Sequence, residues 1–267
     1  MQFWWKTHSC GLPLPSGAKE KRNLSTFVLI HGAWHGAWVW NAVAPLLRQN
    51  GHTVYTPDLP GHGKDTTPVS QVTLQGYVDR VSETLDRCAE PAVLVGHSMG
   101  GIVISQTAEQ RPDRVSCLVY LCAFLLPNGQ CLLQWAEPDK DALVLPNLML
   151  SEDKTSCTLK AEAILQAFYG DCSRQEVEAL ENLLGPQATA PFATPVRLSP
   201  EGFGRIPRVY IECTQDRAIS LGIQRGMCAA SGCDQIYTLN ASHSPFLSMP
   251  REVTDLLLRA SQVKRAA

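Results

Sequence analysis

A serine between two glycines is the first feature of the sequence with a chemical meaning. Gly96-His97-Ser98-Met99-Gly100 fits the pattern G-x-S-x-G. The pattern directly follows the apolar run 92–95 and precedes the stretch 101–110, which is rich in small residues. A serine on a strained turn between a strand and a helix needs small neighbours if its hydroxyl is to be exposed. This setting predicts that Ser98 is a nucleophile.

The sequence offers one candidate for the base that such a serine requires. A serine hydroxyl reacts when a base takes its proton, and a third group must orient the base. In strand-turn-helix sites of this kind, the chain order is serine, acid and then histidine. Of the seven histidines, only His243 follows Ser98, and it lies in the small-residue loop 240–245. We therefore expect His243 to be the base.

Three acidic residues are candidates for the group that orients this base. Asp216 lies three residues beyond the apolar run 208–213, in the loop that leaves a predicted strand. Glu212 lies inside that strand, and Asp234 lies on the entry side of the last strand. Asp216 is the preferred acid because it is placed at the same sheet edge as the nucleophile, while Glu212 and Asp234 stay open as alternatives.

Two backbone amides are expected to bind the oxyanion that forms when a serine attacks a carbonyl carbon. One is the amide of Met99, the residue after the nucleophile. The other is the amide of Ala33, in the loop after the first predicted strand, where Gly32 permits close approach of the backbone. We expect His31 to brace this loop rather than to transfer a proton.

Strand and helix patterns alternate through most of the chain, and these elements must position the candidate residues. Such alternation is typical of right-handed βαβ units around a parallel sheet. The sequence therefore predicts an α/β fold. The predicted strands are 27–30, 53–56, 92–95, 117–124, 208–213 and 235–239, and the predicted helices are 38–50, 74–88, 101–110, 220–229 and 251–263.

The alternation stops in a more polar stretch between about residues 125 and 199. This stretch has helical patterns at 159–169 and 174–184 and ends in a proline-rich passage. Segments inserted between two strands of one sheet commonly cover the strand ends where ligands bind. We therefore expect a helical lid at 125–199, an α/β core at 27–124 and 200–267, and an N-terminal leader at 1–26.

Aromatic residues of the lid and its surroundings are candidates for the substrate pocket. If two or more of them line the cleft, the substrate is apolar rather than charged. Gly32, Trp34 and Trp135 are the predicted substrate contacts. The aromatic candidates are Trp34, Trp135, Phe168, Tyr169, Phe192 and Phe246.

Composition excludes several other classes of protein. The chain has 267 residues, of which 45% are hydrophobic and 18% charged, and its 23 basic and 25 acidic residues give a net charge of −2. This balance leaves no electrostatic footprint for nucleic acid. The apolar run 117–126 is far shorter than the roughly 20 residues of a membrane span, so we expect no membrane contact.

The N-terminal residues show no pattern of an export signal, and the ten cysteines do not have the spacing of a zinc site. We expect free thiols that act as small buried hydrophobic side chains, no bound metal and a cytoplasmic location.

Four stretches, taken together, resemble the α/β-hydrolase family, in the branch of plant methylesterases, hydroxynitrile lyases and bacterial pyrethroid-hydrolase-like esterases. They are 27–38, 94–101, 213–219 and 243–246. The resemblance implies an α/β-hydrolase fold with a mostly parallel central sheet. It also implies a triad of Ser98, Asp216 and His243 that uses no metal or nucleotide cofactor.

Two positions separate the branches of this family. The lyases carry a threonine where this chain has Gly32, and a lysine directly after the catalytic histidine, where this chain has Ser244. The resemblance therefore favours a serine carboxylesterase acting on a small to medium apolar ester. Whether the protein is a monomer or a homodimer stays open. The alternatives are a lyase, a hydrolase of lactones or polyketide esters, and a receptor that binds a small molecule without significant turnover.

Overall fold

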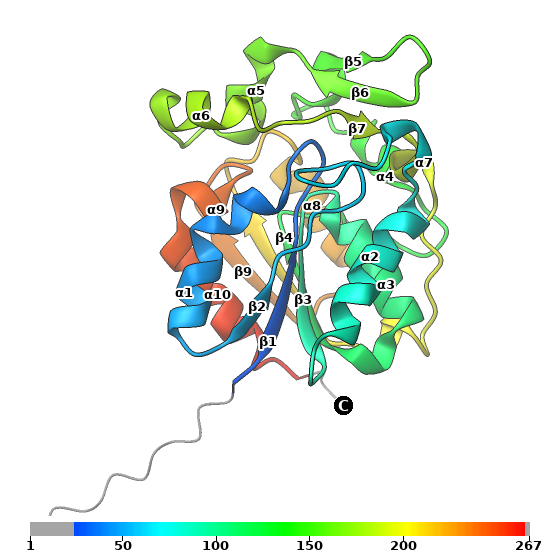
Figure 1. Ribbon diagram of the computed structural model, residues 1–267, viewed down its shortest axis with the longest axis vertical. Helices are drawn as coiled ribbons and strands as arrows, with labels where there is room; N and C mark the ends of the chain where they lie inside the picture. Colours follow the sequence, from blue (N-terminus) through cyan, green and yellow to red (C-terminus); the bar gives the residue numbers. More distant parts are fainter. Residues whose placement is uncertain (1–23, 265–267) are drawn as a thin grey trace, which may run out of the picture.

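The computed structural model describes residues 24–264, which form a parallel sheet, its flanking helices and an insertion above the sheet (Figure 1). Residues 1–23 of the expected leader lie outside this part of the chain. The sheet has six parallel strands in the order β2-β1-β3-β4-β8-β9, which confirms the predicted architecture. The strands are β1 Thr26–Ile30, β2 Thr53–Tyr55, β3 Ala92–His97, β4 Val115–Leu121, β8 Arg208–Cys213 and β9 Gln235–Leu239.

The central strands carry apolar side chains on both faces of the sheet. In β1, Val28 and Ile30 pack into one apolar layer, and Phe27 and Leu29 into the other. Since successive side chains of a strand point to opposite faces, a sheet covered on both sides requires such a continuous apolar run. One face is covered by α2 Leu74–Asp86, α3 Gly100–Gln110 and α8 Leu221–Ser231, and the other by α1 Val43–Gln49, α9 Pro245–Ser248 and α10 Pro250–Ala260.

Several predicted elements end earlier than expected, and two of them differ because the backbone changes conformation. The predicted strand 117–124 ends at Leu121, because Cys122 adopts a positive φ of 36° and turns the chain. The amide of Phe124 then donates to the Ser98 carbonyl at 3.0 Å, which ties this turn to the candidate nucleophile. The predicted helix 38–50 is divided into a 3-10 turn, Ala37–Asn41, and α1.

The insertion lies over the carboxyl ends of the strands (Figure 1). Its helices α5 and α6 occur where the sequence predicts helical pieces, but the segment also contains a three-stranded antiparallel sheet that was not predicted. Strands of two to four residues are too short to show a period-2 pattern. The insertion contains α4 Leu132–Ala136, β5 Leu148–Leu150, β6 Ser156–Leu159, α5 Ala161–Phe168, α6 Arg174–Glu181, β7 Gln187–Ala188 and α7 Ala190–Ala193.

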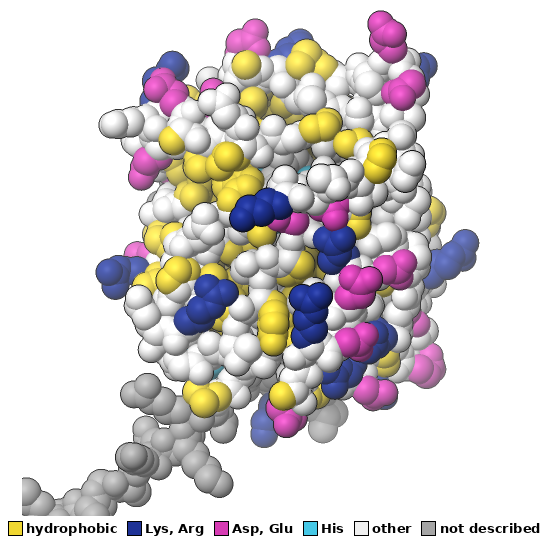
Figure 2. All heavy atoms as spheres, viewed as in Figure 1, with side chains coloured by type: hydrophobic (Ala, Val, Ile, Leu, Met, Phe, Trp, Pro, Cys, Tyr) yellow, Lys and Arg dark blue, Asp and Glu magenta, His cyan; other side chains and the backbone are white. Residues whose placement is uncertain are grey.

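The surface carries charges of both signs. On the face shown in Figure 2, Lys and Arg side chains are interspersed with Asp and Glu side chains, in keeping with the net charge of −2. Within residues 24–264, no helix has both the length and the apolar character needed to cross a membrane.

Candidate active site

Ser98 lies on a sharp turn between β3 and α3. Its φ of 54° is in the left-handed region that side chains other than glycine rarely adopt. The neighbouring glycines make the turn possible, because a β-carbon on Gly96 would lie 2.6 Å from the Gly100 carbonyl oxygen. A β-carbon on Gly100 would in turn lie 2.9 Å from the carbonyl oxygen of Ile30. Strain of this kind is typical of functional sites, and here it presents a serine.

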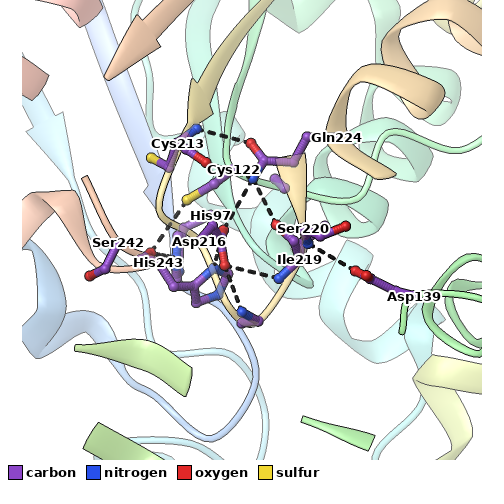
Figure 3. A network of polar contacts seen from close by, with 12 residues as sticks. His97, Cys122, Asp139, Cys213, Asp216, Ile219, Ser220, Gln224, Ser242 and His243 are labelled. Carbon is purple, nitrogen blue, oxygen red and sulfur yellow. Dashed lines mark hydrogen bonds and ion pairs between the residues drawn. The ribbon is translucent and has the colours of Figure 1, made fainter. Parts of the chain in front are cut away.

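His243 and Asp216 form a buried pair. The Nδ1 atom of His243 lies 2.7 Å from Oδ2 of Asp216, and both side chains are almost completely inaccessible (Figure 3). The other carboxylate oxygen of Asp216, Oδ1, accepts from the amides of Ala218 and Ile219 at 2.7 and 2.9 Å. Several N–H donors to one carboxylate fix its orientation. The pair therefore has the geometry of a candidate base with a carboxylate that orients it.

The other two acidic candidates have different partners. Glu212 accepts two hydrogen bonds from Arg225, at 2.8 and 3.0 Å, and the Arg225 guanidinium lowers the pKa of this carboxyl. Asp234 accepts from the backbone amide of Arg208 at 2.8 Å. The structure thus brings Asp216 to His243 and engages Glu212 and Asp234 elsewhere.

A buried glutamine, which was not predicted from the sequence, holds the loop that carries Asp216. Gln224, in α8, accepts from the Cys213 amide at 3.0 Å and donates to the Ile219 carbonyl at 2.8 Å (Figure 3). It also approaches Oδ2 of Asp216 at 3.4 Å. The available signal was a polar residue on the apolar side of the helix, because Gln224 shares its buried face with Met227 and Cys228 at helical spacing.

Two side chains hold the backbone of the His243 loop. Nε2 of His97 donates to the His243 carbonyl at 2.8 Å, and Sγ of Cys122 donates to the same oxygen at 3.3 Å. The His97 and His243 rings lie 4.6 Å apart. Among residues 24–264, these three side chains form the one cluster with metal-ligand atoms within 4.8 Å of one another. Since two of them donate to the His243 carbonyl, the cluster is arranged to hold the loop.

Gly32, Ala33 and Met99 lie where an oxyanion site is expected. Ala33 and Met99 line the same pocket as Ser98. The α-carbon of Gly32 is so close to the nucleophile that an added β-carbon would lie 2.8 Å from Cβ of Ser98. The backbone of this loop therefore lies directly beside the serine.

Two buried histidines brace this loop as neutral side chains. Nε2 of His31 accepts from the Leu59 amide at 3.1 Å, so its Nδ1–H donates to the Gly32 carbonyl at 2.8 Å. His35 donates from Nδ1 to the Ala33 carbonyl at 2.6 Å and accepts at Nε2 from the Tyr169 hydroxyl at 2.8 Å. Burial lowers the pKa of His35 to about 3 and that of His31 well below its usual range. Both rings therefore act as fixed donors and acceptors at neutral pH.

The pocket at Ser98 is walled by apolar side chains from the core and from the insertion. In the part of the chain that the structure describes, Ser98 contributes the one polar side chain of this wall, and no charged side chain lines it. Phe168 links the pocket to the base, because it lines the wall and its ring lies 5.7 Å from that of His243. The wall is formed by Ala33, Trp34, Ser98, Met99, Phe124, Leu132, Ala136, Ala142, Val144, Leu145, Phe168, Phe192, Ala218 and Ile219.

Three of the aromatic candidates do not line this pocket. Trp135, a predicted substrate contact, donates from its indole to Gln130 at 2.5 Å and packs near Gly226 of α8. That assignment was wrong because a tryptophan near the start of the insertion faces the core helix rather than the cavity. Tyr169 bonds to His35, and Phe246 packs in the opposite apolar layer. Trp34, Phe168 and Phe192 are the aromatic side chains that do line it.

Trp34 also fastens the insertion over the pocket. Its φ is 62°, its indole N–H donates to the Cys157 carbonyl at 3.0 Å, and its carbonyl accepts from the Gly185 amide at 2.9 Å. Both partners belong to the insertion. The residue after Ala33 therefore couples the candidate oxyanion loop to the segment above it.

Comparisons with known proteins agree with this geometry. Residues 27–256 match the profile of the alpha/beta hydrolase family. The chain is 32% identical to a pyrethroid hydrolase from Sphingobium wenxiniae, over 88% of this chain and 86% of that protein. It is 30% identical to salicylic acid-binding protein 2 from Nicotiana tabacum, over 87% of this chain and 95% of that protein.

Solved structures give the same result. The crystal structure of polyneuridine aldehyde esterase matches with a TM-score of 0.81 at 26% identity, over 90% of this chain and 100% of that chain. That of a pyrethroid hydrolase matches with a TM-score of 0.79 at 28% identity, over 90% and 98% of the two chains. The protein belongs to the alpha/beta hydrolase family.

Proposed function

We propose that the protein is a serine carboxylesterase that hydrolyses uncharged, apolar esters. The observation that carries the proposal is a strained Ser98 on the wall of an apolar pocket, where the wall residue Phe168 packs on the ring of a buried His243 that is paired with Asp216. This combination matches the needs of acyl transfer through a serine, which requires a nucleophile, a base and a group that orients the base.

Each residue has a role in the proposed reaction. The Oγ atom of Ser98 attacks the ester carbonyl while His243 takes its proton, and Asp216 stabilises the imidazolium that forms. The amides of Ala33 and Met99 bind the developing oxyanion. His243 then gives the proton to the departing alcohol, which leaves an acyl-enzyme. A water molecule, deprotonated by His243, releases the acid and restores Ser98.

The pocket supports an uncharged substrate. A carboxylate or an ammonium placed among these side chains would lose its hydration without gaining a charged partner, at a cost of several kcal/mol. Trp34, Phe168 and Phe192 offer flat apolar surfaces instead. The names of the similar pyrethroid hydrolase and polyneuridine aldehyde esterase support the same reaction class.

The insertion is proposed to act as a lid over the bound ester. Leu132, Phe168 and Phe192, which belong to the insertion, form part of the pocket wall. A closed wall excludes water from the reacting carbonyl and strengthens its interactions with the oxyanion amides.

Cyanohydrin cleavage is disfavoured by the residue after the base. Ser244 is completely buried, and its Oγ has no hydrogen-bond partner among residues 24–264. A neutral hydroxyl cannot replace the ammonium that would stabilise departing cyanide, and an unassisted anion in a closed site raises the barrier by several kcal/mol. We therefore expect ester turnover, and no enzyme-dependent cyanide release from mandelonitrile or acetone cyanohydrin.

The proposal is tested with p-nitrophenyl esters of one chain length, with and without a terminal carboxylate on the acyl chain. We expect multiple turnovers of the uncharged esters, weak or no turnover of the carboxylate series, and no activity in a Ser98→Ala variant. Tight binding of the uncharged esters without repeated turnover would instead indicate a small-molecule receptor and contradict the esterase proposal.

A further inference from the structure

Asp171 holds the loop of the candidate base from the insertion above it. This residue follows α5, outside the pocket wall, and its carboxylate accepts three hydrogen bonds from the core, besides one at 3.9 Å from Sγ of the neighbouring Cys172. Oδ2 accepts from the Ser242 amide at 3.0 Å and from the Ser248 hydroxyl at 2.8 Å, and Oδ1 accepts from the Ser242 hydroxyl. Asp171 is 71 residues from Ser242 in sequence, so this is a tertiary contact between the insertion and the core.

The contact fixes the backbone on one side of His243, while other residues fix it on the other side. Ser242 directly precedes His243 in the sequence. The amide that donates to Asp171 therefore belongs to the residue before the base. The carbonyl of His243 accepts from His97 and Cys122. The Asp216 carboxylate accepts from the ring of His243. His243 is therefore held at its ring, at its carbonyl and at the preceding amide, and Asp171 binds that amide.

The residues just before Asp171 pack on the same loop. The Phe168 ring lies 5.7 Å from the His243 ring, at an interplanar angle of 33°. A β-carbon on Gly170 would lie 3.7 Å from Cβ of Ser242, which is ordinary contact distance. One short segment of the insertion thus contacts the ring of the base, the residue before it and the backbone that carries it.

We propose that Asp171 is a positioning residue for His243, through which the docked insertion sets the orientation of the base. The inference rests on the proposed function, because it assigns the base role to His243. Asp171 does not line the pocket, so its loss should affect the chemical step rather than substrate binding. A displacement of about 1 Å at a reacting group can cost about 100-fold in rate.

Asp171→Ala removes both acceptor oxygens and with them the three hydrogen bonds from Ser242 and Ser248, and we expect kcat to fall by about 10- to 100-fold with KM changed less than about twofold. Asp171→Asn should restore kcat to within about threefold of the wild type. Its carbonyl oxygen can accept from the Ser242 amide and the Ser248 hydroxyl, and its NH₂ group can donate to the Ser242 hydroxyl, which rotates to accept. Glu178→Gln in α6 is the matched control, because this exposed carboxylate has no hydrogen-bond partner within residues 24–264.

The experiment measures kcat, KM, thermal midpoint and the rate at which an alkyl fluorophosphonate labels Ser98 in the four proteins. The inference predicts slower labelling and lower kcat in Asp171→Ala, with wild-type values in Glu178→Gln and near-wild-type values in Asp171→Asn. Wild-type labelling and kcat in a folded Asp171→Ala variant would overturn it. An equal loss in Asp171→Asn would attribute the effect to charge and would also overturn it.

A Ser242→Ala/Ser248→Ala double variant keeps the inference testable if Asp171→Ala does not fold. It removes two of the three donors, and we expect kcat to fall by about tenfold with KM unchanged. A folded double variant with wild-type kcat would overturn the inference. Failure of the proposed function looks different, because the wild type itself would then not be labelled at Ser98.

Discussion

Gly32 approaches Ser98 so closely that an added β-carbon would lie 2.8 Å from Cβ of the serine and 3.0 Å from Nδ1 of His97. Neither neighbour can withdraw at low cost, because Cβ of Ser98 is fixed by the strained turn and His97 is bonded to the loop of His243. Only glycine lets the candidate oxyanion loop pass this close to the nucleophile. The relationship between these residues therefore ties a sequence feature directly to the geometry of the site.

Gly32→Ala should lower kcat/KM by about 10- to 100-fold while the protein stays folded. The inserted methyl group must displace either the loop or Ser98, and overpacking of this kind typically costs about 1–3 kcal/mol of stability. Steady-state ester kinetics and urea unfolding check both expectations. Gly222→Ala in α8 is the matched control, since the nearest atom to its added β-carbon is 3.9 Å away. Equal kinetics in the two variants would contradict this account of the loop.

Asp216→Asn should lower kcat by about 10⁴, because an amide in this position favours the wrong tautomer of the base. Glu212→Gln should leave kcat within about twofold of the wild type, since Glu212 bonds to Arg225 and to the Thr238 hydroxyl rather than to the base. Parallel steady-state kinetics of the two variants decide between the acids. A larger loss in Glu212→Gln than in Asp216→Asn would reverse the assignment.

Gln224→Leu should lower the free energy of unfolding by about 2–4 kcal/mol. The substitution keeps the approximate volume but leaves the buried Cys213 amide and Ile219 carbonyl without the partners they have in Gln224. Each buried polar group that loses its partner costs about 1–3 kcal/mol. Urea unfolding measures the loss, and kcat should fall with it because the same loop carries Asp216. Unchanged stability would show that the amide does not hold this loop.

The folded protein should lose stability as the pH falls from 7.5 to 5.5. Burial lowers the pKa of His31, His35 and His97 below the usual value of about 6.5, so these rings stay neutral when folded and take up protons when unfolded. Since the unfolded state binds more protons in this range, the free energy of unfolding decreases with decreasing pH. The three rings together should contribute about 4 kcal/mol over these two pH units.

Urea unfolding at pH 7.5, 6.5 and 5.5 measures this dependence. The range lies above the ordinary pKa values of carboxyl groups, so their titration contributes little to it. About 3 kcal/mol of the loss should occur between pH 6.5 and 5.5, and about 1 kcal/mol between pH 7.5 and 6.5. A flat profile from pH 7.5 to 5.5 would show that the buried rings are protonated in the folded protein.

The parts of the fold that sequence reasoning predicted are those with a strong local pattern. The continuous apolar runs of β3 and β8 identify strands buried on both faces, and the glycines around Ser98 identify the turn. Chain order alone selects His243, since no other histidine follows the serine. The acid was harder to choose, because three carboxylates lie near strand ends and only tertiary contacts separate them.

The parts that were missed depend on contacts between distant segments. The sheet of the insertion is made of strands that pair across turns and an intervening helical segment, with no pattern inside each strand. Asp171 lies in a polar stretch with nothing to distinguish it from its neighbours, and its role depends on Ser242, 71 residues away. Trp135 was assigned to the pocket from its residue type, whereas its direction is set by packing against α8.

The position of the acyl group during turnover shows directly whether Ser98 is the nucleophile. The protein is mixed with a p-nitrophenyl ester, quenched in acid within milliseconds and digested, and the peptides are mapped by mass spectrometry. We expect an acyl group on Ser98 in the wild type, and neither acyl group nor turnover in Ser98→Ala. An acyl group on any other residue, or full turnover by Ser98→Ala, would contradict it.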